Sequence, residues 1–252
     1  MSHRHRPDAV AMVTGAGKRR VGSFIARMLA ERSYRVAIHY RSSQSDAELL
    51  KNELLAQGRE AEVFQADMAE VSSIDRMFDQ VLERFGRLDV LVTAAAVWEP
   101  CRLESMTPES VKEHFYVNAL GSFWCCRRAG LTMVNQPEGG VIITIGDWAI
   151  ERPYLNYAGY FISKGCIPTM TRVLAIELSH RNPNIRVNAI MPGPVMMPNH
   201  LPEEEKIEVI RSTLLQKEGK PEHIVSAVEF LIDNDYVTGV CLPVDGGRTI
   251  GG

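Results

Sequence analysis

Short apolar runs recur along the chain and alternate with longer stretches in which apolar residues return every three or four positions. The runs contain many β-branched residues, and several are apolar almost throughout, which is typical of strands buried on both faces of a parallel sheet. Glycines and polar residues separate them from the stretches on either side. The pattern predicts about seven strands, at Ala9–Thr14, Arg35–Tyr40, Ala61–Ala66, Leu88–Ala94, Gly140–Gly146, Ile185–Met191 and Val240–Val244.

The stretches between these runs predict helices. Between the first two strands, Val21, Phe24, Ile25, Met28 and Leu29 share the spacing of one helix face. Further helices are predicted over residues 44–57, 72–85, 107–117, 119–134, 157–180 and 221–232.

Alternation of strands and helices indicates an α/β fold, a doubly wound parallel sheet flanked by helices. Ligands of such a sheet bind outside the carboxyl ends of its strands. No change in composition and no low-complexity linker divides the chain, so residues 1–252 are expected to form a single domain. Residues 194–220 are expected to be a substrate-loop insertion in that domain.

The composition excludes several classes of function. Of the 252 residues, 45% are hydrophobic and 23% charged, and a net charge of −3 gives no general reason to expect nucleic-acid or membrane binding. No apolar run approaches the roughly 20 residues of a membrane span. Five cysteines without a paired spacing, and an N-terminus without the apolar core of a secretory signal, predict a reduced, cytoplasmic protein. No metal site is expected, and His3 and His5 are interpreted as tail residues.

A glycine-rich loop joins the first predicted strand to the first predicted helix. Glycines there let the backbone approach a pyrophosphate, and the following helix offers unpaired N–H groups and the positive end of its dipole. A glycine loop alone also serves tight turns, but this position favours dinucleotide binding. The candidate residues are Gly15, Gly17, Lys18, Arg19, Arg20, Val21 and Gly22.

The end of the second strand indicates which dinucleotide binds. Sites for NAD carry an acid about 20 residues beyond the glycine motif, but here the chain reads Tyr40-Arg41-Ser42-Ser43. Arginine and hydroxyl groups would hold a 2′-phosphate that a carboxylate would repel. The sequence therefore predicts NADPH rather than NADH, with a solvated loop arginine as the alternative for Arg41. Asp67 and Met68 are candidates for the adenine contact, and Asp67 can equally be a helix cap.

A tyrosine and a lysine four residues apart form a candidate acid/base pair. Tyr160 and Lys164 would share one face of a helix. An ammonium group beside a phenol is expected to lower the phenol pKa from about 10 toward working pH. Asp147 stands thirteen residues before this tyrosine and adds a carboxylate to the candidate site.

With these motifs, Asn118 in Val-Asn-Ala-Leu-Gly, Pro192-Gly193 and the closing Val244-Asp-Gly-Gly247, the chain resembles the short-chain dehydrogenase/reductase family over essentially its whole length. The resemblance implies a Rossmann-type single domain, a nicotinamide cofactor and a homotetramer. It also implies that Tyr160 donates or accepts the proton. Lys164 would bind the nicotinamide ribose, and Asn118 would help to hold a water on the proton path.

Three positions depart from that family. The glycine motif has one extra residue. The segment after the fourth strand is Thr93-Ala-Ala-Ala96, where Ala94 and Ala95 still leave room for the cofactor. Asp147 stands where the family has a serine. A serine hydroxyl donates a hydrogen bond to a substrate carbonyl, whereas an ionised aspartate cannot donate and repels a developing alkoxide.

Pteridine reductases within this family carry an aspartate at this position, and the chain resembles them elsewhere too. Their loop Lys-Arg matches Lys18-Arg19, and their pterin-stacking aromatic falls at Trp98, which can also be simple packing. The resemblance implies hydride transfer to a C=N carbon of a pterin. Tyr160, or Asp147 through it, would protonate the neighbouring nitrogen. Tyr157 would line the pocket or pack, and Arg19 or Arg20 would reach the substrate or the cofactor phosphates.

Two alternatives remain open at the level of sequence. One is a short-chain reductase of a carbonyl substrate, such as a 3-oxoacyl thioester, a sugar or a steroid. The other is a non-catalytic dinucleotide-binding redox sensor, which is disfavoured because the acid/base residues are all present.

Overall fold

Seven parallel strands form the centre of the molecule, in the order β3-β2-β1-β4-β5-β6-β7. The computed structural model describes residues 8–198 and 201–251. The predicted doubly wound, Rossmann-type sheet is confirmed, and each predicted strand is present with ends shifted by at most two residues. The strands are β1 (Val10–Thr14), β2 (Arg35–Tyr40), β3 (Ala61–Gln65), β4 (Val90–Thr93), β5 (Gly140–Ile145), β6 (Ile185–Pro192) and β7 (Cys241–Val244).

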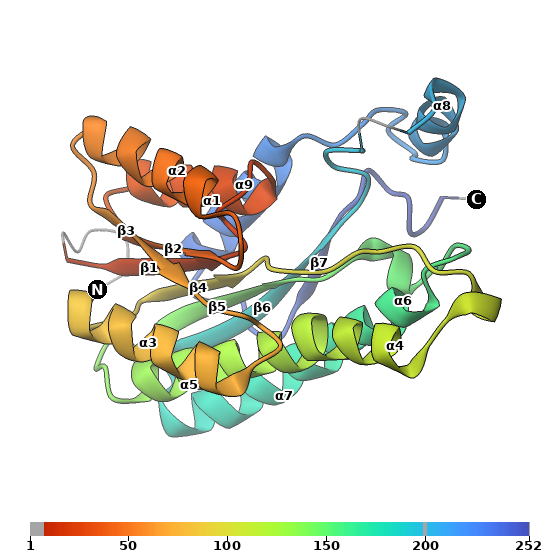
Figure 1. The fold of residues 1–252 in the computed structure, drawn as a ribbon. Coiled ribbons are helices and arrows are strands. Elements are labelled where there is room, and N and C mark those ends of the chain that lie inside the picture. The colour runs from red at the N-terminus through yellow and green to blue at the C-terminus, as the bar shows by residue number, and fades with distance from the viewer. Residues whose placement is uncertain (1–7, 199–200, 252) are drawn as a thin grey trace.

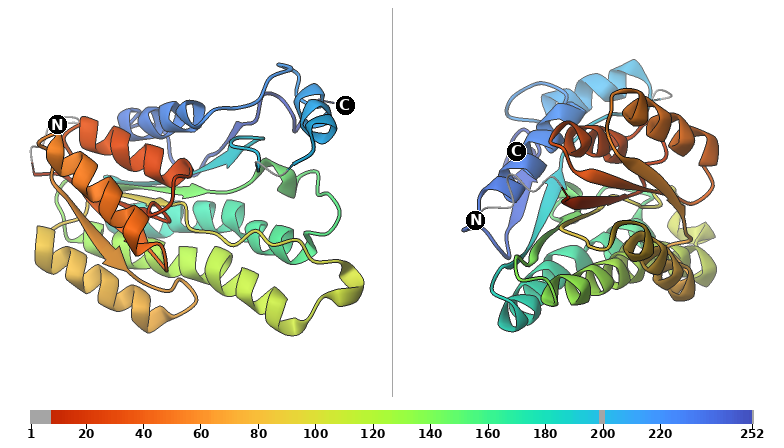
Figure 2. Two further views of the ribbon diagram at one scale, coloured as in Figure 1. Left: turned by 45° about the horizontal axis from the view of Figure 1, so that its top comes forward. Right: turned by 90° about the vertical axis from the view of Figure 1, so that its left-hand side faces the viewer.

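Helices cover both faces of the sheet (Figure 1). Each face has its own apolar layer, because alternate residues of the buried strands point to opposite sides. One layer packs under α1 (Val21–Glu31), α2 (Gln44–Ala56) and α9 (Pro221–Asp233). The other packs against α3 (Val71–Phe85), α5 (Ser122–Val134) and α7 (Cys166–Arg181). The two views of Figure 2 show the same three-layer arrangement.

One long helical segment replaces the two helices predicted over 107–117 and 119–134. It begins as α4 (Pro108–His114), passes through a π-helical stretch at Phe115–Gly121 and continues as α5. The backbone at both joins keeps right-handed helical angles, so the chain does not break. A π-helical turn holds one extra residue and often marks a functional site. Asn118 lies in this turn.

The helix predicted over residues 157–180 is divided at Gly165 into α6 (Ala158–Lys164) and α7. Pro168 gives the physical reason. It has no N–H to donate to the carbonyl four residues earlier, at Lys164, so the helical ladder is interrupted there. The division leaves Lys164 at the end of α6.

An element absent from the sequence prediction lies in the segment 194–220. Three glutamates begin α8 (Glu203–Arg211), where negative charge is stabilised by the helix dipole. After α8 the Leu215 N–H donates to the carbonyl of Gly246. The helix therefore lies beside the C-terminal segment, as both Figure 1 and Figure 2 show.

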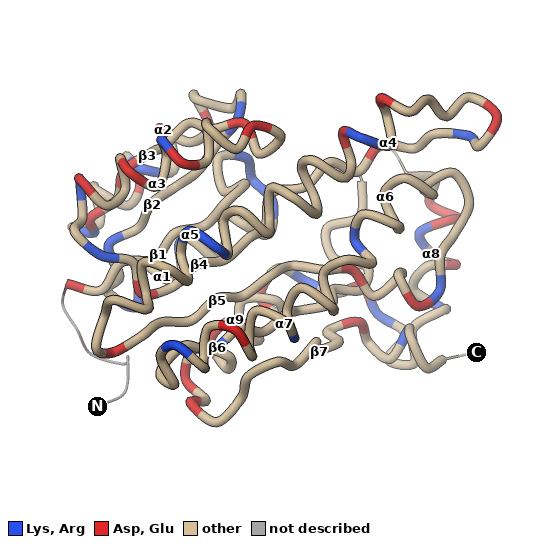
Figure 3. Tube along the Cα trace, turned by 90° about the horizontal axis from the view of Figure 1, so that it is seen from below, with Lys and Arg blue, Asp and Glu red and all other residues tan. Residues whose placement is uncertain are grey.

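Charged residues lie mainly on the outer helices and loops, where basic and acidic segments are interspersed (Figure 3). Within the described ranges, no helix is long and apolar enough to cross a membrane. In the same ranges no group of three or more His, Cys, Asp or Glu side chains could hold a metal ion. His3 and His5 fall outside the described residues.

Candidate active site

The carboxylate and the phenol singled out in the sequence are hydrogen-bonded to each other. Asp147 follows β5, and Tyr160 lies on α6. The Tyr160 hydroxyl donates to Oδ2 of Asp147 at 2.6 Å, and the Ala149 N–H donates to Oδ1 at 2.8 Å. The second bond makes Asp147 the N-cap of a short 3₁₀ turn, which fixes the direction of its carboxylate. The phenol of Tyr160 and the carboxylate of Asp147 are therefore held in one relative orientation.

Lys164 joins this pair from the last position of α6. Its Nζ donates to the carbonyl oxygen of Ile145 at 2.7 Å, at the end of β5. An ammonium group has three N–H donors, so this bond leaves further donors for a ligand. The structure brings Tyr160, Lys164 and Asp147 together at the carboxyl end of the sheet.

The charge states in this cluster differ from the expectation for the Tyr160–Lys164 pair. Burial and the adjacent Asp147 carboxylate raise the pKa of Tyr160 well above its ordinary value of 10. Burial lowers the pKa of Lys164 to about 8, although Asp147 acts in the opposite direction. Burial also raises the pKa of Asp147, and its hydrogen bonds and nearby cations only partly oppose this. The expected lowering of the tyrosine pKa is wrong for this structure, and Tyr160 holds its proton as a donor would.

Asn118 is fully buried and acts as a clamp. Its Oδ1 accepts from the Val97 N–H at 2.9 Å, and its Nδ2 donates to the Val97 carbonyl and to Ser163 Oγ, both at 3.0 Å. Both amide hydrogens are used within the protein. The side chain therefore connects the segment after β4 to α6. A water on a proton path could hydrogen-bond to this side chain only through the remaining lone pair of Asn118 Oδ1.

The glycine-rich loop is held against two strands. Gly15 has a φ of +69°, and a Cβ there would lie 2.7 Å from the Cα of Ala95, so no side chain fits. The Thr14 hydroxyl accepts from the N–H groups of Ala94 and Ala95 at 3.0 and 3.1 Å. Buried His39 accepts from the Gly15 N–H at 2.9 Å. The loop and the segment after β4 are thus one rigid unit.

The remaining candidates for cofactor binding border the same edge of the sheet. Lys18, Arg19, Arg20, Arg41 and Ser42 are exposed, and Met68 is buried. Oδ1 of Asp67 accepts from the Ala69 N–H at 2.9 Å in the turn before α3, and this bond leaves Oδ2 for another contact. The N-cap of α3 is Glu70, so the alternative of a helix cap at Asp67 is wrong.

Pro192 ends β6, and the next residue packs against the C-terminal segment. A Cβ on Gly193 would lie 2.5 Å from the Cα of Asp245. The Gly193 N–H donates to the carbonyl of Val244 at 3.0 Å. The ends of β6 and β7 therefore meet at the same side of the sheet as the glycine loop.

Two aromatic residues that the sequence predicts to contact the substrate are stacked on each other. The rings of Trp98 and Tyr157 have centroids 4.9 Å apart and an angle of 14° between their planes. Tyr154 packs edge-on against Tyr157, with centroids 5.2 Å apart. The stack occupies one face of the Trp98 ring, so a flat substrate has only the other face of that ring available. Together these rings form a wall beside Tyr160.

Comparison with known proteins identifies the family. A family model described as enoyl-(acyl carrier protein) reductase matches residues 15–249. The chain belongs to the short-chain dehydrogenase/reductase family. It is 32% identical to a 3-oxoacyl-[acyl-carrier-protein] reductase of Staphylococcus epidermidis, over 94% of this chain and 97% of that protein. It is also 32% identical to versicolorin reductase 1 of Aspergillus parasiticus, over 98% and 99%.

Solved structures of other family members have the same fold. A blue fluorescent protein from a metagenomic library, crystallised with NADPH, matches with a TM-score of 0.87 and 33% identity over 95% of this chain and 97% of that one. An acetoin dehydrogenase from Enterobacter cloacae matches with a TM-score of 0.87 and 31% identity over 97% of both chains. This short-chain dehydrogenase/reductase is accordingly an oxidoreductase.

The structure of this family member also places a residue at the site that the sequence analysis missed. The guanidinium carbon of Arg248 lies 4.3 Å from the ring centroid of Trp148, the residue after Asp147. Its charge acts on both Asp147 and Tyr154. Arg248 directly follows the Val244-Asp-Gly-Gly247 motif, but nothing in that spacing indicates that the segment folds back to the site.

Proposed function

We propose that this oxidoreductase takes hydride from NADPH and delivers it to a C=N carbon of a pterin. The observation that carries the substrate class is the 2.6 Å hydrogen bond between Tyr160 and Asp147, in a place where the family has a serine hydroxyl. The cofactor, the substrate and the assembly are argued separately below.

The residues around the glycine loop fit a dinucleotide phosphate. Arg20 is the N-cap of α1, and no side chain caps the first N–H groups of this helix. Those donors and the positive end of the dipole suit an anion. The exposed cations Lys18 and Arg19 add positive charge beside them. At the site of hydride transfer, Lys164 has spare N–H donors for the nicotinamide ribose.

The preference for NADPH rests on the turn between β2 and α2. Arg41 and Ser42 are exposed there, and Ser43 is the N-cap of α2 without a side-chain cap bond. A 2′-phosphate would meet a guanidinium, hydroxyl groups and unpaired helix N–H groups. The structural relative crystallised with NADPH supports the same choice.

The protein side of the reaction begins with a protonated Tyr160, whose raised pKa keeps the proton in place until the substrate takes it. After hydride reaches the C=N carbon, the neighbouring nitrogen needs one proton, and the tyrosine hydroxyl supplies it. The phenolate left on Tyr160 regains a proton once the Asp147 carboxylate has taken one up from solvent and passes it across the same contact, which returns Asp147 to its ionised form. An ionised Asp147 also accepts hydrogen bonds from ring N–H groups, which pterins have and simple ketones lack.

A second candidate is reduction of a carbonyl, which the relatives named as a 3-oxoacyl-carrier-protein reductase and versicolorin reductase favour. The carboxylate of Asp147 opposes it, because a developing alkoxide next to an anion is destabilised. A serine at this position would donate a hydrogen bond to that alkoxide instead. The two candidates therefore predict opposite effects of one substitution.

The deciding experiment measures NADPH oxidation by wild type and Asp147→Ser with dihydrobiopterin, dihydrofolate and an acetoacetyl thioester. We expect kcat/KM with the dihydropterins to fall about 100-fold, since a positioned acid/base group contributes that much or more. Activity on the thioester should rise. Asp147→Asn, which keeps the shape without the charge, is the matched control. Pterin activity that is unchanged in Asp147→Ser would contradict the proposal.

We further propose that the protein is a cytoplasmic homotetramer whose segment 194–220 covers the substrate. All five cysteines are unpaired, which supports a reducing location.

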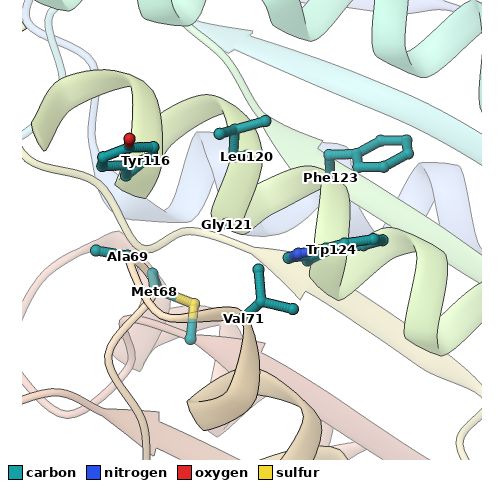
Figure 4. Close-up of a pocket in the computed structure, with 8 residues that line it drawn as sticks. All are labelled: Met68, Ala69, Val71, Tyr116, Leu120, Gly121, Phe123 and Trp124. Atoms are coloured by element: carbon teal, nitrogen blue, oxygen red, sulfur yellow. The ribbon is translucent and has the colours of Figure 1, made fainter. Parts of the chain in front are cut away.

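A surface pocket of about 290 Å³ lies between α3 and the π-helical turn (Figure 4). Its lining includes the exposed side chains of Tyr116, Leu120 and Phe123. Apolar side chains of this kind support burial against another subunit.

A further inference from the structure

The described C-terminal segment, Asp245–Gly251, folds over the active site and is fixed there by its first residue. Oδ1 of Asp245 accepts from the Gly247 N–H at 3.0 Å. Its Oδ2 accepts from the N–H and the hydroxyl of Thr249 at 2.7 and 2.6 Å. These bonds lie on both sides of Arg248, so the backbone sets the position of this arginine.

Among the described residues, the guanidinium of Arg248 has a fixed position but no hydrogen-bond or ion-pair partner. It rests on the buried ring of Trp148, at 4.3 Å from the centroid. Within residues 8–198 and 201–251, no side chain or carbonyl accepts a hydrogen bond from it, and no carboxylate lies in ion-pair contact with it. A guanidinium has five N–H donors, so stacking on one ring leaves its hydrogen-bonding capacity for a ligand.

A second arginine makes this end of the site more positive. Arg152 donates to the carbonyl oxygen of Arg248 at 3.2 Å and to that of Gly251. Burial lowers the pKa of Arg248 and the charge of Arg152 adds to the lowering, whereas Tyr154, Asp147 and the Asp245 carboxylate oppose it. The carboxylate of Asp147 is hydrogen-bonded to Tyr160 and Ala149 and makes no ion pair with Arg248. A further anion here would offset a positive charge that the fold holds partly desolvated.

We propose that Arg248 binds a carboxylate on the substrate, and that the enzyme prefers substrates with a carboxylate over their uncharged analogues. The inference rests on the proposed reductase activity at Asp147 and Tyr160, but it does not depend on the pterin. One half-buried guanidinium balances one negative charge. It therefore suits a monoanionic carboxylate, which also matches its planar fork, better than a dianionic phosphate.

The test uses two cyclic imines with the same reacting C=N group, 3,4-dihydroisoquinoline-7-carboxylate and its methyl ester, because the Asp147 carboxylate is expected to oppose reduction of an aldehyde. Wild type should reduce the acid with the higher kcat/KM. In Arg248→Met, whose aliphatic stem still covers Trp148, the acid-to-ester ratio should fall about tenfold, through KM for the acid. Arg84→Met is the matched control, because Arg84 lies 4.9 Å from the ring of Phe85 at the far end of α3. Its acid-to-ester ratio should equal that of wild type.

Three results overturn the inference: a wild type without preference for the acid, an unchanged ratio in Arg248→Met, or equal losses for both imines. If Arg248→Met does not fold, wild type is measured at low and high salt. Screening should reduce the preference for the acid, and a preference insensitive to salt counts against the inference. If the imine pair behaves as expected while dihydropterins are not reduced, the pterin proposal fails and the role of Arg248 stands.

Discussion

His39 shows how one buried side chain fixes the start of the proposed cofactor site. Its Nδ1 accepts from the Gly15 N–H, so the proton of the neutral ring is on Nε2, which donates to the Ala66 carbonyl at 3.1 Å. The ring thus connects the ends of β1, β2 and β3. Burial lowers the pKa of His39 to about 4, and protonation of Nδ1 would break the bond to the glycine loop.

This side chain predicts how stability depends on pH. The unfolded chain takes up a proton near pH 6.5 and the folded chain near pH 4, so the stability contributed by neutral His39 is present above pH 6.5 and is lost as the pH falls toward 4. The loss should reach about 3 kcal/mol. In His39→Gln, whose amide can accept and donate in the same directions, the free energy of unfolding by urea should depend less on pH.

The control for this experiment is His180→Gln, which changes an exposed histidine at the end of α7. Its pH dependence should follow that of wild type between pH 4 and 6.5. An acid loss of stability that is as large in His39→Gln as in wild type would show that other groups cause it.

At the residue scale, the spacing in the sequence was enough to predict that Tyr160, Lys164 and Asp147 lie together. A four-residue interval on a helix is local geometry, and the alternation of strands and helices places the end of β5 beside that helix. The direction of the tyrosine pKa was not predictable, because it depends on burial and on the Asp147 carboxylate together. The position of Arg248 was not predictable either, because it is set by hydrogen bonds of Asp245 in the last turn.

The element that decides between the two nicotinamide cofactors is the N-terminus of α2. Ser43 is the N-cap of this helix and Arg41 precedes it; residues 41–43 include no acid, and the first one is Asp46 in the first turn of α2. We expect Arg41→Ala to raise KM for NADPH about tenfold or more, since one charge-assisted contact to the 2′-phosphate is lost. KM for NADH, which has no such phosphate, should change little.

Arg59→Ala is the control for that change. Arg59 also lies outside the helices, but its Nη1 donates to Ser33 Oγ at the opposite end of β2. Its cofactor preference should equal that of wild type. Equal effects of Arg41→Ala on both cofactors, or comparable kcat/KM for the two in wild type, would exclude the proposed role.

Strands and helices differed in how well their sequence pattern predicted them. Buried strands such as β1 and β5 were clear because both faces are apolar. The division between α6 and α7 was missed because Pro168 interrupts the hydrogen-bond ladder without interrupting the apolar repeat. No side chain of α8 is fully buried, and its apolar residues are only Ile207, Val209 and Ile210, which is too short a repeat to predict a helix.

At the scale of the whole molecule, α5 and α7 expose apolar side chains on the outer surface. Val173 and Ile176 of α7 are 49% and 71% exposed, and Leu131 of α5 is 41% exposed. In the proposed homotetramer these residues would be buried between subunits. We expect Ile176→Glu to shift the protein toward smaller species in light scattering after size-exclusion chromatography, since an unpaired charge in an apolar interface is costly.

Leu49→Glu is the matched control, because Leu49 is 62% exposed on α2, on the other face of the sheet. It should leave the assembly unchanged. Two outcomes would argue against an interface on α5 and α7: a monomeric wild type, or an Ile176→Glu variant with the wild-type mass.

The contact of Arg152 with the carbonyls of Arg248 and Gly251 has a practical consequence. The described chain ends next to the residues that surround the substrate, whereas its first strand begins at the opposite end of the sheet (Figure 1). A fluorescent protein inserted next to Gly251 would lie close to Arg248 and Trp148, so we expect it to change KM for the substrate. The same insertion before β1 should leave KM unchanged.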